Sequence, residues 1–164
     1  MLSENYLQLG TSIVELLRTD LDANLNAGVV KSAPCVIQGI AGDDDIEAAL
    51  QNRSVVVTVA YMGDFDDTAR SGVTETAIKQ AWMVLVSVQH ISGVDAHTRT
   101  TEVAGAYMSG VRKCLTGKQL DPEASPLKQL ALTDLRGRPS YTAEGSHFPM
   151  FFTSNVRMHS NVRR

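Results

Sequence analysis

Two cysteines and four histidines are the residues of this sequence best suited to act as nucleophiles, bases or metal ligands. Cys35 and Cys114 form neither a C-x-x-C motif nor a disulfide framework, which is typical of a chain in a reducing cytoplasm. No two histidines stand four residues apart, and none has cysteine or carboxylate neighbours at metal-site spacing. The histidines are His90, His97, His147 and His159. These residue types therefore predict no metal site and no cofactor.

An acidic stretch after the first predicted strand has some of the spacing of a calcium loop. Asp64, Asp66 and Glu75 would stand at positions 1, 3 and 12 of such a loop. Position 6 is Ala69, however, where the sharp turn needs glycine, and a strand precedes the loop in place of a helix. We therefore expect an ordinary solvated loop.

The sequence carries no glycine-rich motif for a phosphate or a nucleotide. Its nearest cluster, residues 39–42 (GIAG), has the spacing of neither a dinucleotide fingerprint nor a P-loop. Gly117 and Lys118 are followed by Gln119, which has no hydroxyl to place on magnesium. A G-x-S-x-G elbow for a nucleophilic serine is also missing. We therefore predict no catalytic residues and no enzymatic activity.

Composition fits a soluble globular protein with one domain over residues 1–164. Apolar residues make up 43% of the chain and charged residues 20%. The longest uncharged stretch, residues 80–94, is too short and too β-branched for a membrane helix. We therefore expect no membrane partner.

Charge is distributed unevenly along the chain. Residues 1–75 hold 12 acids and 4 bases, a net of −8, and residues 76–164 hold 6 acids and 11 bases, a net of +5, which together give −3. If the halves occupy different faces, an acidic patch of one copy can meet a basic patch of another. If they mix in space, the asymmetry vanishes, and the sequence leaves both possibilities open.

Hydrophobic periodicity predicts two principal helices and one short helix. Apolar residues recur at helical spacing over residues 3–24, and a second stripe runs over residues 94–115. Asp95 is the expected N-cap of that second helix. Residues 43–50 begin with three aspartates, which favour a helix start through the helix dipole.

Alternation of apolar residues predicts strands over residues 53–61, 77–91, 127–135 and 147–159. The second of these is apolar on both faces and should be central in the sheet. Pro149 indicates an edge strand or a bulge at the start of the last one. The predicted fold class is α+β, an antiparallel sheet of about four main strands with the two principal helices packed on it.

Several segments, taken in order, resemble the Mu-like phage tail protein family that is associated with tail termination. Residues 55–63 (VVVTVAYMG) resemble its first sheet strand, and residues 80–89 (QAWMVLVSVQ) resemble its long strand, which begins with a glutamine and an aromatic residue. Residues 104–117 resemble its Ala-Gly to Leu-x-Gly helix, although Lys118 stands where an aromatic residue commonly follows. Segments similar to its opening helix and closing strands are residues 13–18, 126–135 and 141–156.

The resemblance implies a structural role without catalysis. Tail terminators form rings, commonly of six subunits, that stop the growth of the tail tube and present a surface to the head connector. The implied partners are other copies of the chain, the tail tube protein and a head-completion or connector protein. The implied locations are the bacterial host cytoplasm during assembly and then the virion tail.

Two loops and the basic C-terminus are the expected contact surfaces. The expected subunit or tube contacts are Asp64, Phe65, Asp66, Asp67, Arg70, Arg136, Arg138 and Tyr141. The expected lumen-facing or partner-facing bases are Arg157, Arg163 and Arg164. Aromatic residues are not interleaved with these arginines, so DNA can pass them without being read.

Two alternatives stay open. The chain can be another tail-completion or tube-type virion subunit, which would polymerise into long tubes. It can also be a small ligand-binding domain that uses His147 or His159 on a sheet face.

Overall fold

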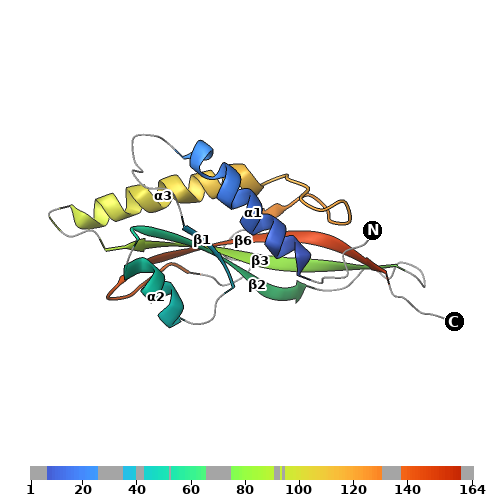
Figure 1. Cartoon of the computed structure of the whole chain (residues 1–164), viewed down its shortest axis with the longest axis horizontal. Helices are drawn as coiled ribbons and strands as arrows, with labels where there is room; N and C mark the ends of the chain where they lie inside the picture. The colour runs from blue at the N-terminus through green and yellow to red at the C-terminus, as the bar shows by residue number, and fades with distance from the viewer. Residues whose placement is uncertain are drawn as a thin grey trace.

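Figure 1 shows the computed structural model of the chain, which describes residues 7–25, 35–39, 43–51, 53–65, 75–90, 93, 95–130 and 138–159. A central sheet separates two helical layers, with α1 and α3 over one face and α2 on the other. We call these the α1–α3 face and the α2 face. None of the described helices is long and apolar enough to cross a membrane.

The described strands form one mixed, six-stranded sheet. They are β1 (Cys35–Gln38), β2 (Val55–Phe65), β3 (Glu75–Gln89), β4 (Lys128–Leu130), β5 (Ser140–Tyr141) and β6 (Gly145–His159). Their order is β1-β2-β3-β6-β4, with β5 also paired to β6. Among the strand pairs that the structure describes, β1–β2 alone is parallel. The α+β class is confirmed, and the predicted antiparallel sheet of about four strands matches only roughly, because the sheet is mixed and has six described strands.

The long strand β3 lies at the centre of the sheet, as its apolar faces predict. It pairs with β2 on one side and with β6 on the other, and Trp82 stands between Tyr61 and Phe152. Because directly paired residues share a face, Trp82, Val84 and Val86 lie on the α1–α3 face. Neighbouring residues of β3, such as Leu85 and Ser87, therefore lie on the α2 face.

The main core lies between the α1–α3 face and two helices. The helices are α1 (Gln8–Asp20), followed by the short 3₁₀ helix η1 (Asp22–Asn24), and α3 (Ala96–Leu115). Ile13, Leu17 and Tyr107 from these helices are fully buried with Val84 and Phe152 from the sheet. Burial of each such side chain stabilises the fold by about 1.5–3 kcal/mol.

Two glycines let these helices approach their neighbours closely. A Cβ atom at Gly10 would overlap ring carbons of Trp82, so α1 can lie over the indole only with glycine there. A Cβ atom at Gly110 would meet Leu25 Cδ2 at 2.9 Å and Leu21 Cδ1 at 3.0 Å. Gly105, in contrast, is exposed with nothing near it, so the close contact of α3 is restricted to part of that helix.

The edge strand β1 is held by α1. The Arg18 guanidinium donates to Val36 O from Nη2 at 3.0 Å and from Nε at 3.2 Å. The parallel pairing of β1 with β2 is possible because α2 (Asp43–Gln51) forms the crossover between them. Ile46 and Leu50 of α2 are buried against Val56 on the α2 face.

The last strand, β6, is an interior strand, which corrects the expectation of an edge. It pairs with β3 along its length and with β4 and β5 on its other side. The amides of Asn155 and Arg157 point toward the β4 side, where they donate to Ser125 Oγ and Glu123 O. By alternation, the Pro149 nitrogen, which carries no hydrogen, faces the same side. It lies between the stretches of β6 that pair with β5 and with β4, so no ladder hydrogen bond is lost there.

Candidate interaction site

The segment between α3 and β4 is tied into a compact loop by its backbone. Gly117 has a φ of 78° and ends α3, because a left-handed residue costs little at glycine. Its N–H donates to Leu127 O at 2.8 Å, and the Leu127 N–H donates to Lys118 O at 2.9 Å. At the tip, Asp121 Oδ1 accepts the Glu123 N–H at 2.9 Å. The loop is therefore preformed.

The returning part of this loop extends the edge of β6. The Ser125 N–H donates to Asn155 O at 2.7 Å, and the Arg157 N–H donates to Glu123 O at 2.8 Å. Ala124 pairs with Val156, but Lys128 pairs with Thr153, so one extra residue lies on the β4 side between them. This bulge contains Pro126, a residue that sheets tolerate at such positions.

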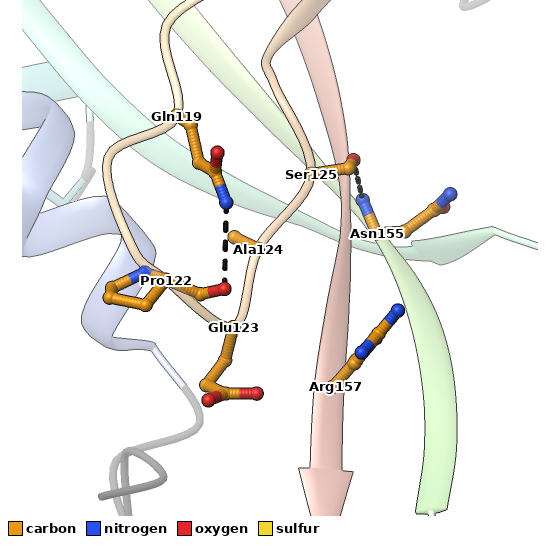
Figure 2. A pocket seen from close by; sticks show the side chains of 7 residues that line it. All are labelled: Gln119, Pro122, Glu123, Ala124, Ser125, Asn155 and Arg157. Atoms are coloured by element: carbon orange, nitrogen blue, oxygen red, sulfur yellow. Dashed lines mark hydrogen bonds between the residues drawn. The ribbon is translucent and has the colours of Figure 1, made fainter.

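A pocket of about 360 Å³ lies between this loop and the C-terminal part of β6. We call it the terminal pocket; its lining residues are Gln119, Pro122, Glu123, Ala124, Ser125, Asn155 and Arg157. Figure 2 shows Gln119 and Pro122 on the loop side and Asn155 and Arg157 on β6. One carboxylate, one guanidinium, two amides and a hydroxyl suit polar contacts with a protein segment.

Three exposed cations surround Asn155 on the α2 face, and we call this group the basic end. Lys79 of β3 is paired directly with Asn155, while Arg157 lies two residues further along β6. Lys128 of β4 is paired with Thr153, two residues before Asn155. Because β-sheet partners and their second neighbours share a face, the three cations point to the same side. Three strands thus combine their charges on one rigid surface.

The opposite end of the α2 face holds the only histidine that the structure buries among the residues it describes. His147 Nδ1 lies 2.9 Å from Ser87 Oγ, and Nε2 lies 3.3 Å from Thr142 Oγ1. A pocket of about 260 Å³ borders it, lined also by Ile46, Glu47, Leu85 and Ser140. Ser87 is fully buried, so its hydroxyl has no open path to a substrate. The pair fastens β6 to β3.

Cys114 is placed as a core residue and not as a reactive thiol. Cys114 is buried in the main core, where burial first and the Asp20 carboxylate second raise the pKa of its thiol. A thiol with a raised pKa is a poor nucleophile and a poor metal ligand. In the described part of the chain, no three His, Cys, Asp or Glu residues gather to hold a metal ion.

Two of the predicted contact residues lie in a strand and not in the expected loop. Asp64 and Phe65 belong to β2, where Asp64 Oδ1 accepts the Tyr61 hydroxyl at 2.6 Å. The predicted loop therefore begins later, because Gly63, with a φ of 111°, forms a bulge and not the end of the strand. Other predicted residues lie outside the described part: Asp66, Asp67, Arg70, Arg136, Arg163 and Arg164.

The remaining predicted residues lie at two separate ends of β6. Arg138 and Tyr141 are exposed near its start, and the Tyr141 ring meets Phe148 edge-on with a centroid separation of 6.3 Å. Arg157 belongs to the basic end, near the other terminus of the strand. Sequence reasoning missed Lys79, Lys128 and Glu123. Alternation along β3 and β6 shows which residues share a face of each strand. It does not give the register between the two strands, and the register is what sets Lys79 beside Asn155.

Comparisons with known proteins identify the fold and no family. No family model matches the sequence, and no curated protein matches it. Among solved structures, a chain described as "Virion of native gene transfer agent (GTA) particle" has a TM-score of 0.55 and 16% sequence identity. The match covers 92% of this chain and 95% of that chain. The two chains therefore share a fold along nearly their whole lengths.

Proposed function

We propose that this protein is a phage-type virion structural protein, and specifically a ring-forming tail terminator. The observation that carries the proposal is the end-to-end likeness to a chain of a gene transfer agent virion, at a TM-score of 0.55. The match covers 92% of this chain and 95% of that chain, so the likeness extends along nearly the whole of both. The ordered resemblance to the tail-termination family supports the more specific role.

The proposed ring is a closed homo-oligomer built from one repeated heterologous interface, with no twofold contact between its subunits. By the resemblance, it has six subunits, caps the tail tube and binds the head connector. It assembles in the host bacterial cytoplasm and remains in the virion tail. No catalytic step enters this role, and no cofactor is needed for it.

The exposed residues near the start of β6 are the proposed contacts with the tube or a neighbouring subunit. Tyr141 is 61% exposed, the largest exposed fraction among the big hydrophobic side chains that the structure describes. Exposed aromatic residues commonly supply a large share of interface energy. The predicted residues Asp64, Phe65, Asp66, Asp67, Arg70 and Arg136 are retained as further proposed contacts with the tube or a neighbouring subunit.

The basic residues near the C-terminus are proposed to face a partner or the ring lumen. Arg157 is exposed on the α2 face, and Arg163 and Arg164 follow it in the sequence. DNA can pass such a surface through phosphate contacts without sequence-specific binding.

Light scattering after size exclusion tests the ring. We expect one discrete species of about six times 17.8 kDa over a range of protein concentrations. Open-ended growth into tubes would identify a tube subunit instead. A monomer that binds a small ligand and gains thermal stability from it would support the ligand-binding alternative at His147.

A further inference from the structure

We propose that the basic end of one copy receives helix α2 of a second copy. This inference rests on the proposed function, because it names the contact through which the ring would assemble. It concerns the α2 face alone, since the opposite face is covered by α1 and α3 (Figure 1).

The basic end has the properties of a docking surface. Lys79, Lys128 and Arg157 are all exposed, and they come from three neighbouring strands held in register by backbone hydrogen bonds. The terminal pocket adjoins this surface, because Asn155 and Arg157 belong to both. The surface thus offers three fixed cations and amide groups that can donate hydrogen bonds, with the single carboxylate of Glu123 beside them in the pocket.

Helix α2 carries the complementary charge. Its nine residues include Asp43, Asp44, Asp45 and Glu47 and no basic residue. It lies on the same sheet face, around Val56 and Leu85. On β3, Ser87 is paired with Val56 of the α2 cluster and Lys79 belongs to the basic end, and eight residues along a strand correspond to roughly 26 Å. Each copy therefore holds an acidic helix and a basic surface well apart from one another.

This separation favours contact between copies over contact within one copy. Two basic ends would repel each other across a twofold axis, as would two α2 helices. The acidic α2 of one copy attracts the basic end of another. After this contact, one copy still has a free basic end and the other a free α2, so further copies can add. Such a head-to-tail contact closes into a ring or extends into a filament.

Two charge-reversed variants of the full chain test the contact. In K79E/K128E/R157E the basic end becomes acidic, so it carries the same charge as α2. In D43K/D44K/D45K the start of α2 becomes basic, so it carries the same charge as the basic end. We expect each variant alone to self-associate more than about 100-fold more weakly than the native chain, because like charges then face each other. An equimolar mixture should recover the native assembly, because each variant then supplies what the other lacks, and an even-numbered ring can alternate the two.

A third variant controls for charge change alone. R99E/R112E/K113E reverses three exposed bases on α3, and it should assemble like the native chain. Circular dichroism of every variant, with light scattering at low and high salt, completes the test. Added salt should weaken native assembly, because charges in solvent are screened over about 8 Å at physiological ionic strength.

The outcomes separate this contact from the proposed function. If the native chain forms its ring and K79E/K128E/R157E forms it equally well, the contact is wrong and the ring stands. If the mixture of folded variants stays dissociated while the native chain assembles, the pairing of these two surfaces is also wrong. If the native chain forms no assembly at any salt concentration, both proposals fall.

Discussion

The two faces of the sheet differ in what they do for the molecule. The α1–α3 face is almost wholly apolar, and Trp82, Tyr107 and Phe152 fill the space beneath its helices. The α2 face holds only a small apolar cluster around Val56, and it adds a hydrogen-bonded histidine and exposed cations. The first face therefore supplies most of the folding energy, while the second is available for partners.

The largest expected difference between regions is the effect of removing a core ring. Trp82→Ala deletes a buried indole beneath α1, and such changes cost about 3–5 kcal/mol. Met62→Ala removes a side chain that is 47% exposed at the bulge of β2, and it should change stability by less than about 0.5 kcal/mol. Urea unfolding of both variants measures the contrast. Equal losses would show that the core is not centred on Trp82.

A matched pair of helical glycines sharpens the comparison. Gly10→Ala places a methyl group against Trp82 and should destabilise the fold by about 1–3 kcal/mol. Gly105→Ala adds the same methyl group where α3 faces open space, and it should stabilise by about 0.5–1 kcal/mol through helix propensity. Thermal unfolding of the two variants should give shifts of opposite sign. A stabilising Gly10→Ala would contradict the close approach of α1 to the indole.

Alkaline pH should weaken the α1–α3 side specifically. Burial first, and the Asp22 carboxylate second, raise the pKa of Tyr107 to about 12. An unfolded tyrosine ionises near pH 10, so the contribution of Tyr107 is full below pH 10 and is lost as pH rises toward 12. The loss amounts to at most about 3 kcal/mol. Tyr107→Phe should flatten this part of the stability curve; an unchanged slope would rule Tyr107 out as its source.

Two hydroxyls on the α2 face should give modest effects, again with opposite signs. Ser87→Ala removes the partner of His147 Nδ1 and should cost about 1–2 kcal/mol. Thr58 Oγ1 is buried without a hydrogen-bond partner, so Thr58→Val should gain about 1 kcal/mol. Guanidinium unfolding distinguishes the two. A loss at Thr58→Val would mean that its hydroxyl is satisfied in solution.

The sequence was sufficient for the long elements and insufficient for pairings between distant segments. Alternation located β2, β3 and β6, because each strand is long and has at least one consistently apolar face. The four residues of β1 give no such signal between Pro34 and Gly39, and their parallel pairing depends on α2 as a crossover. The role of Gly10 is equally invisible locally, because it depends on Trp82 from another element.

The candidate site was foreseen only in part for the same reason. Arg157 was singled out by the basic C-terminus, and Tyr141 by its turn-rich surroundings. Lys79 and Lys128 become part of the site only through the register that sets them on either side of β6. Asp95 is the N-cap of α3, as predicted, but it has a φ of 68° and its side chain makes no capping hydrogen bond.

Copy number in purified particles tests the central claim most directly. Quantitative mass spectrometry of particles from the host that carries this gene would count chains per tail. A terminator ring predicts about six copies in every particle, whatever the length of the tail. Absence of the chain from the particles, or a copy number that grows with tail length, would contradict the account.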